Sequence, residues 1–183
     1  KKEAKREDRG EDESRTSMSL RSEALHMLDE FMQLVMSDLD IHAVLDNIIE
    51  YIMKVTGADR GFLVLVDENG ELFSHVIRVK EETDGQGDQS LKQFSRSITK
   101  KVLETKESIC LADVQDDSHF AAAQSIQGLD IRSAICVPFK DKEENVIGLI
   151  YIDRQTLISA FSADDLSVVE LLANYASIAV VNA

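Results

Sequence analysis

The stretch IRSAICVPFKDKEENVIGLIYIDRQTLISAFSADDL, residues 131–166, determines the fold class that this sequence predicts. It contains two apolar, largely β-branched runs, residues 131–139 and 146–153, which are separated by six mostly charged residues. That spacing is typical of an antiparallel hairpin. Ser162 is followed three residues later by Asp165, a pair that resembles a capping box and predicts that a helix begins there.

The residues before this stretch alternate between helical and strand-like patterns. A helix with one apolar face is predicted to end at Gly57. The turn residues 67–70 read Asp-Glu-Asn-Gly between two strand-like runs, and Asn-Gly is a strong hairpin signal. A short helix is predicted over 94–105, a short strand over 108–111 and a closing helix over 163–182. Strands that are joined mainly by hairpins and bracketed by helices predict an α+β fold.

The amino-terminal part of the chain has a different character. Residues 1–17 mix both charges without a large apolar side chain, which predicts a disordered or linker tail. Residues 18–37 carry apolar positions at alternating spacings of four and three, as in a coiled coil, and these are Leu20, Ala24, Met27, Phe31 and Leu34. Because this helix precedes the domain expected at 38–183, it has no core of its own to cover. We therefore expect a homodimer held by this helix and the closing helix.

Charge and hydropathy exclude several classes of partner. The chain is 44% hydrophobic and 30% charged, which is an ordinary composition for a soluble domain. Its net charge of −14 repels phosphate backbones, so no nucleic-acid partner is expected. No apolar run is long enough to span a bilayer, so a cytoplasmic protein without membrane contact in this segment is expected. The chain lacks an initial Met and stops within a helical pattern, which suggests a fragment of a longer protein.

No pattern of residues predicts catalysis. The motifs G-x-S-x-G, G-x-G-x-x-G and the P-loop are absent from the sequence. Cys110 and Cys136 both lie in apolar, strand-like runs, which predicts reduced core thiols and neither a nucleophile nor a covalently occupied residue. The densest polar cluster comprises Asp113, Asp116, Asp117 and His119. Carboxylates in such a loop are usually solvated or cap helices, so no metal site is predicted and the segment is not expected to be an enzyme.

Several segments, taken in order, resemble one known family. They are GADRGFLVLVD (57–67), SRSITKKVLETKESICLADVQDDSHF (95–120), GLDIRSAICVPF (128–139), and VIGLIYIDR (146–154) with FSADDL (161–166). Over roughly residues 39–181 the chain resembles a GAF domain, the small-molecule sensor module of signalling proteins. The resemblance implies a six-stranded antiparallel sheet with helices packed on it. It implies the ligand less strongly, because GAF domains bind cyclic nucleotides, bilins, haem, metabolites or nothing.

Individual motifs of the family narrow the choice of ligand. Bilin-binding GAF domains attach the pigment to a Cys ahead of the final hairpin, where this chain has Ser118-His119-Phe120, so no covalent cofactor is expected. GAF enzymes that reduce free methionine sulfoxide need several cysteines, and the two cysteines of this chain lie elsewhere.

Cyclic-nucleotide GAF domains carry Asn-Lys and then Phe-x-x-x-Asp-Glu near the last strand and helix. This chain has Asp153-Arg154 and then Phe161, Asp165 and Leu166, so that the motif is half met. The resemblance implies an Arg154–Asp165 ion pair that would tie the hairpin to the closing helix.

The family pattern also places a set of residues around a ligand cavity between the sheet and residues 113–131. They are Phe62, Ile77, Arg78, Ile98, Thr99, Phe120, Gln124, Gln127, Ile131, Ser133 and Tyr151. Among them, Arg78 is expected to face an anionic group and Phe120 an aromatic ring. The apolar members could equally be ordinary core residues.

These expectations together predict a non-catalytic GAF sensor domain of a multidomain signalling protein. Its expected ligand is cyclic AMP or cyclic GMP, and its expected output domain is a diguanylate or adenylate cyclase. One alternative is a GAF dimerisation module without a ligand. Another is a metal- or haem-based gas sensor that uses His75 or His119.

Overall fold

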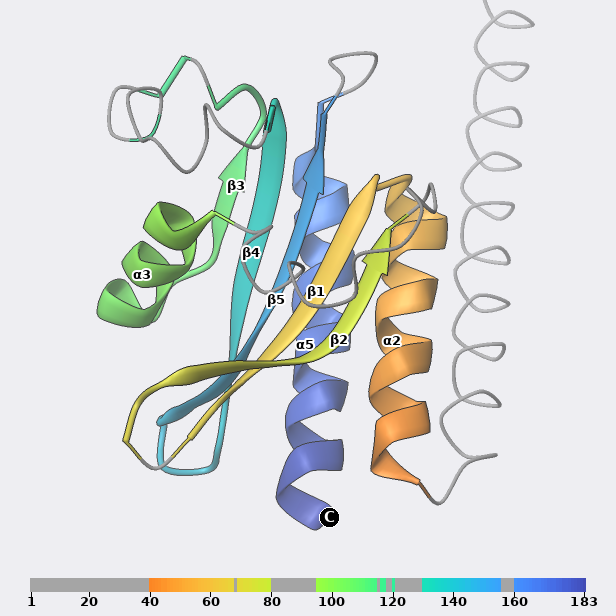
Figure 1. Cartoon of the computed structure of the whole chain (residues 1–183), viewed down its shortest axis with the longest axis vertical. Helices are drawn as coiled ribbons and strands as arrows, with labels where there is room; N and C mark the ends of the chain where they lie inside the picture. Colours follow the sequence, from red (N-terminus) through yellow and green to blue (C-terminus); the bar gives the residue numbers. More distant parts are fainter. Residues whose placement is uncertain are drawn as a thin grey trace, which may run out of the picture. The chain divides into compact units, whose positions relative to one another are not determined.

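Five antiparallel strands form the sheet around which the described residues are arranged (Figure 1). They are β1 (Arg60–Val66), β2 (Leu72–Val79), β3 (Ile109–Leu111), β4 (Ser133–Lys140) and β5 (Val146–Arg154). Their order across the sheet is β2-β1-β5-β4-β3, so that the first hairpin and the last hairpin meet where β1 pairs with β5. Residues from opposite halves of the domain therefore lie side by side at the centre of the sheet.

The computed structural model describes residues 40–67, 69–79, 95–114, 116–117, 120, 130–155 and 160–183. The predicted tail at 1–17 and the predicted coiled-coil helix at 18–37 lie outside these residues, and so do Gln124 and Gln127. The predicted antiparallel sheet with helices packed on it is confirmed. The described residues supply five of the six strands that the prediction assigned to the whole chain.

Local signals in the sequence explain where the three described helices begin and end. Helix α2 (Ile41–Thr56) starts after Asp40 and ends at Gly57, which has a φ of 66° that favours glycine. Helix α3 (Arg96–Thr105) starts after Ser95. Helix α5 (Ala163–Asn182) starts with a complete capping box, in which Ser162 and Asp165 bond each other's backbone N–H groups. The predicted ends at Gly57 and Ser162 are therefore confirmed.

Helices α2 and α5 pack on one face of the sheet, which we call the α2–α5 face (Figure 1). Its core consists of fully buried aliphatic side chains from both helices and from the inward positions of the strands. They include Leu45, Ile48, Ile49, Ile52, Leu63, Ile135, Ile150, Ile152, Val169 and Ala176. This dense apolar layer fixes the two helices to the sheet.

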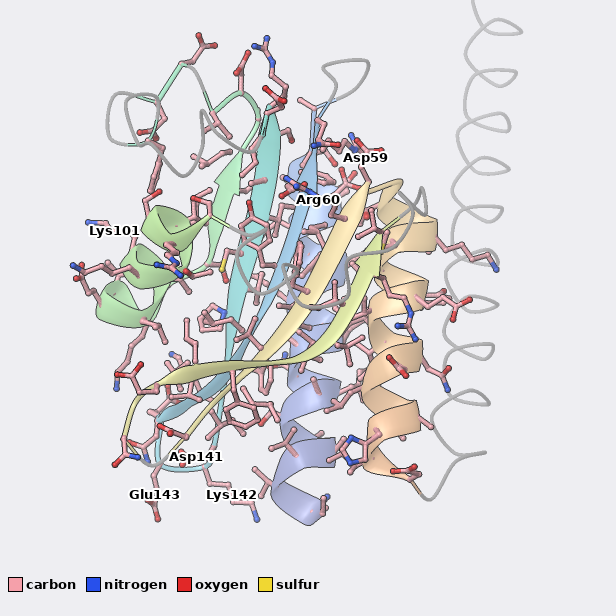
Figure 2. All side chains as sticks on the ribbon, in the orientation of Figure 1. Asp59, Arg60, Lys101, Asp141, Lys142 and Glu143 are labelled. Atoms are coloured by element: carbon pink, nitrogen blue, oxygen red, sulfur yellow. The ribbon has the colours of Figure 1, made fainter. Side chains whose placement is uncertain are left out.

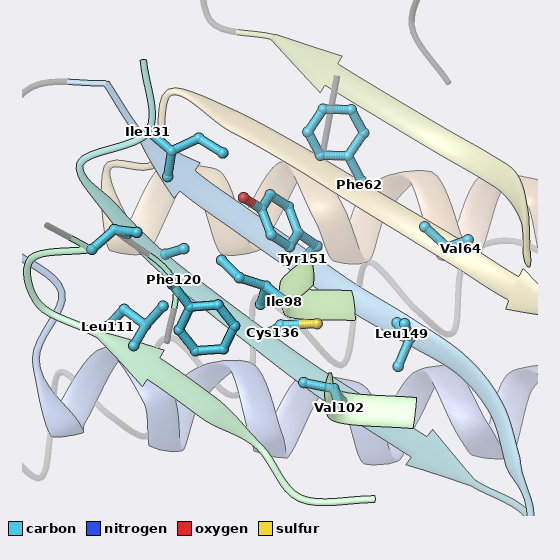
Figure 3. Packing of buried hydrophobic residues seen from close by; sticks show 12 residues of the cluster. Phe62, Val64, Ile98, Val102, Leu111, Phe120, Ile131, Cys136, Leu149 and Tyr151 are labelled. Atoms are coloured by element: carbon cyan, nitrogen blue, oxygen red, sulfur yellow. The ribbon is translucent and has the colours of Figure 1, made fainter. Parts of the chain in front are cut away.

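Helix α3 contacts β4 and β5, and its side chains join a second core on the opposite side, which we call the α3 face (Figure 3). This core contains the buried aromatic side chains Phe62, Phe120 and Tyr151 together with aliphatic residues from α3 and the strands. Two cores, one on each face, follow from strands whose successive side chains point to opposite sides. Among the described residues, no helix has the length and hydropathy required to cross a bilayer.

Candidate functional site

The α3 face carries an aromatic pair at its centre. Phe62 on β1 and Tyr151 on β5 lie directly opposite each other in the sheet, because their strands are in register at this point. Their ring centroids are 5.8 Å apart and the ring planes make an angle of 61°, which is an edge-to-face arrangement (Figure 3). Both side chains are fully buried. These two predicted site residues are therefore brought together on one face.

Helix α3 covers part of the same face. Ile98 is fully buried in the cluster around the aromatic pair, and Thr99 is 2% exposed. The Thr99 hydroxyl lies 3.2 Å from the carbonyl oxygen of Ser95, to which it donates one turn back along the helix. The structure thus places Ile98 and Thr99 near the predicted position, with the hydroxyl already bonded inside α3.

Phe120 and Ile131 complete the described wall of this face. Phe120 is 8% exposed and Ile131 is 2% exposed, and both belong to the α3-face core. Ile77 on β2 packs against the same core as a partly buried residue and lies opposite Phe62. Seven of the predicted site residues therefore lie on or beside the α3 face. The other four predicted residues are Arg78, Ser133 and the two glutamines.

The prediction for Arg78 is wrong. Arg78 pairs with Gly61, and a Cβ on Gly61 would lie 3.0 Å from Met53 of α2, so this position belongs to the α2–α5 face. The Arg78 guanidinium forms a 2.9 Å ion pair with Asp46 on α2. Ile77 and Arg78 are consecutive in one strand, and consecutive side chains in a strand point to opposite faces. Only Ile77 can face the aromatic pair.

Ser133 also turns away from the predicted cavity. It pairs with Arg154 at the end of β5, and its hydroxyl oxygen accepts a 3.1 Å hydrogen bond from the backbone N–H of Phe161. Phe161 immediately precedes the N-cap of α5. The buried Ser133 side chain therefore anchors the start of α5.

The predicted Arg154–Asp165 ion pair is replaced by other contacts. Arg154 donates to the backbone carbonyl of Thr56, the last residue of α2, and its guanidinium carbon lies 4.2 Å from the centroid of the Phe161 ring. Asp165 is engaged in the capping box with Ser162. The prediction named the right cation at the right end of the hairpin but gave it the wrong partner.

The ion pair that does form at this end of the sheet joins Arg60 and Asp153, which lie opposite each other on β1 and β5. Arg60 donates from Nε to Oδ1 at 2.8 Å and from Nη2 to Oδ2 at 2.9 Å. The side chains are 7% and 0% exposed. Both occupy the α3 face because they are two residues from Phe62 and Tyr151. Figure 2 labels Arg60 at the start of β1. This role of Arg60 was not predicted, although an Arg at the start of an apolar strand indicates that an acidic partner lies nearby.

Burial changes the protonation equilibria of this cluster. Desolvation raises the pKa of Asp153 above its usual range, against the opposing effect of the Arg60 guanidinium. Desolvation also raises the pKa of Tyr151, and the neighbouring Asp153 carboxylate raises it further. The α3 face therefore combines an apolar, aromatic wall with one buried, bidentate ion pair.

The thiols and acidic clusters give no sign of reactive chemistry. Burial raises the pKa of the Cys136 thiol far above its usual range, and burial followed by the Asp165 charge raises that of Cys110. Within the described ranges, no group of three or more His, Cys, Asp or Glu side chains is placed to hold a metal ion. His119 lies outside those ranges, as does the side chain of His75.

A polar groove of about 370 Å³ lies elsewhere, between the β4–β5 turn, the end of α3 and the middle of α5. Lys106 donates to the carbonyl oxygen of Glu144 at 3.2 Å, and Lys140 pairs with the Glu144 carboxylate at 3.1 Å. Its cations are thus engaged with the turn itself, so we place the candidate site on the α3 face.

The described sheet carries a helix pair on one face and, on the other, an aromatic core that α3 partly covers. The family model described as "GAF domain" matches residues 38–181. The chain therefore belongs to the GAF domain family.

The chain is also similar to known proteins in sequence and in structure. The chain is 24% identical over 170 residues to the "Dual 3',5'-cyclic-AMP and -GMP phosphodiesterase 11" of Drosophila melanogaster, covering 86% of this chain and 12% of that protein. Among solved structures, the GAF domains of phosphoenolpyruvate-protein phosphotransferases from Coxiella burnetii and Acinetobacter superpose with TM-scores of 0.67 and 0.66, at 16% and 17% identity. Each alignment covers 86% of this chain and 92% of the other. These structures share the fold.

Proposed function

We propose that this chain is the regulatory, ligand-binding domain of a multidomain signalling protein, and that its ligand is a cyclic nucleotide bound on the α3 face. The observation that carries the proposal is the Phe62–Tyr151 pair beside Ile98, Phe120 and Ile131. An aromatic and aliphatic wall with few polar groups suits a purine ring. The relative from Drosophila melanogaster, which is named as a dual cyclic-AMP and cyclic-GMP phosphodiesterase, supports this class of ligand.

The proposed role is regulatory. Ligand binding would favour one arrangement of the domain over another, and α5 would carry the difference to an output domain such as a diguanylate or adenylate cyclase. The proposal includes a cytoplasmic location and a homodimer that forms through helices flanking the sheet.

Titration calorimetry with cyclic AMP and cyclic GMP tests the ligand, with the linear nucleotides AMP and GMP as controls. Tyr151→Phe removes one hydroxyl from the aromatic wall, and we expect a three- to tenfold loss of affinity, since a neutral hydrogen bond contributes roughly 0.5–1.5 kcal/mol. Arg78→Ala is the matched control, because Arg78 pairs with Asp46 on the α2–α5 face. It should leave the affinity unchanged.

Absence of binding by the unmutated protein would remove the cyclic-nucleotide assignment. A second candidate function would then take its place, that of a dimerisation module whose α3 face is filled by its own side chains. The exposed apolar residues Leu171, Ile178 and Val181 on α5 suit a helix partner, as this second function and the first both require.

A further inference from the structure

The last two residues of β5 contact opposite faces of the sheet. Asp153 lies opposite Arg60 on the α3 face, and Arg154 lies opposite Ser133 on the α2–α5 face. The two residues share one peptide unit, which is planar and rigid. A displacement of this peptide unit therefore moves the Cα atoms of both residues.

On the α3 face, the anchor is the bidentate Arg60–Asp153 pair. Two parallel hydrogen bonds of 2.8 and 2.9 Å hold both the distance and the orientation of the planar groups. The backbone adds a third link, because the N–H of Asp59 donates to the carbonyl oxygen of Asp153 at 3.0 Å. Together these bonds fix the end of β5 against the start of β1.

On the α2–α5 face, one guanidinium contacts the last residue of α2 and the residue that precedes the N-cap of α5. Arg154 donates to the carbonyl of Thr56, where the α2 backbone ends and carries partial negative charge. The same group lies over the ring of Phe161, the residue before the Ser162 N-cap of α5. Arg154 is 8% exposed, so these contacts are largely shielded from water.

We propose that Asp153 and Arg154 couple the α3 face to the helix pair, so that the state of the Arg60–Asp153 pair sets the position of the end of α2 and the start of α5. An ion pair buried at this depth adds little net stability compared with apolar residues of the same volume. It is, however, sensitive to any polar group that competes for Arg60 or Asp153. The coupling itself does not depend on the proposed function. Only the chemical nature of the competing polar group rests on that function.

Hydrogen exchange of the full chain, followed by mass spectrometry or NMR without ligand, tests the coupling. Arg60→Lys keeps the charge but loses the two-pronged geometry. We expect amide exchange at Gly57 and at Asp165 and Leu166 to rise about three- to tenfold, although these amides lie at the helix ends and none contacts Arg60. The amides of Gly57 and Leu166 bond to Met53 and Ser162 in the native state, so each reports on its own helix end.

A second variant tests the same coupling from the α2–α5 face. Coupling acts in both directions, so Arg154→Lys should also raise exchange at Asp59 on the other side of the same strand end. The control is Lys140→Met, which breaks the exposed Lys140–Glu144 pair at the far end of the β4–β5 hairpin. It should leave the amides of Gly57, Asp59 and Leu166 unchanged.

Unchanged exchange at both helix ends in folded Arg60→Lys would overturn the coupling, and so would an equal rise in Lys140→Met. Circular dichroism and the melting temperature of each variant establish that it is folded. Because no ligand is present, a failure here leaves the ligand proposal standing, and a failure of calorimetry leaves this result standing.

Discussion

Phe139 occupies the space in which Gly148 would carry a side chain. The two residues lie directly opposite each other on β4 and β5, and a Cβ on Gly148 would lie 2.1 Å from the Cζ atom of the Phe139 ring. Phe139 is 1% exposed, so its ring cannot swing into solvent without losing its burial. This cross-strand pair is a packing contact that no other residue at position 148 can reproduce without a shift.

Gly148→Ala is therefore expected to lower the free energy of unfolding by about 1–3 kcal/mol, the usual cost of adding atoms to a filled core. Urea denaturation measures the change. Phe139→Leu in the Gly148→Ala background should recover part of the loss, because it removes the ring atoms that collide. Additive losses in the double variant would show that the two side chains do not compete for space.

The capping box at the start of α5 gives a second prediction. Ser162→Ala removes the oxygen that accepts from the N–H of Asp165 at 3.2 Å, and we expect a loss of roughly 1 kcal/mol in unfolding free energy. Ser167→Ala is the control, since Ser167 is on the same helix and its hydroxyl donates to the carbonyl of Ala163 at 3.0 Å. That change should be close to neutral. Equal losses in both variants would contradict a capping role.

We expect the free energy of unfolding to depend on pH because of the turn between β4 and β5. The Asp141 carboxylate accepts hydrogen bonds from the side chain and backbone of Asn145 and the backbone of Glu143, and these bonds lower its pKa below 3.8. A lowered pKa means that the stabilisation is present above pH 3.8 and is lost as the pH falls through the folded-state pKa.

Asp141→Asn should therefore be less stable than the unmutated protein at about pH 6, and the difference should shrink at a second pH well below 3.8, since the stabilisation is lost as the pH falls through the folded-state pKa. Urea denaturation at the two pH values measures this. A difference that stays constant between them would show that ionisation of Asp141 does not stabilise the turn.

The carboxyl-terminal half of α5 predicts self-association. Leu171, Ile178 and Val181 are 49%, 56% and 44% exposed, and residues 171–183 contain no charged side chain. The spacing of seven and three residues places these three side chains on one stripe. We expect Ile178→Glu to weaken the dimer at least about tenfold, because it would bury a charge at the interface.

Sedimentation velocity over a range of concentrations measures the dimer, with Thr105→Glu as the control. Thr105 is exposed at the end of α3, so the control adds the same charge on the other side of the sheet. A monomer in the unmutated protein, or an equal effect of both variants, would contradict an interface on α5.

The helices and hairpins could be predicted because their signals are local. The Asn69-Gly70 turn, the αL end at Gly57 and the Ser162 cap each depend on a few adjacent residues, and the structure places all three as predicted. The apolar members of the candidate site also follow from local pattern, since alternation along β1 and β5 carries Phe62 and Tyr151 to one face.

The same alternation could have corrected one error. Assigning both Ile77 and Arg78 to one cavity ignores the rule that neighbouring strand residues point to opposite faces. The rule does not predict which residue Arg78 pairs with. Arg78 meets Asp46 because α2 lies over β2 on that face, and this follows only from the packing of the helix on the sheet.

By itself, the sequence determined the order and type of the elements, the caps of the helices and the likeness to GAF domains. Only the tertiary structure decided which charges meet. Arg60 and Asp153 are 93 residues apart, and Arg154 and Thr56 are 98 apart, so each contact depends on the register in which β5 pairs with β1. A shift of one residue in that register would turn every side chain of β5 to the opposite face. The partners of a buried charge are therefore a property of the assembled sheet and its helices.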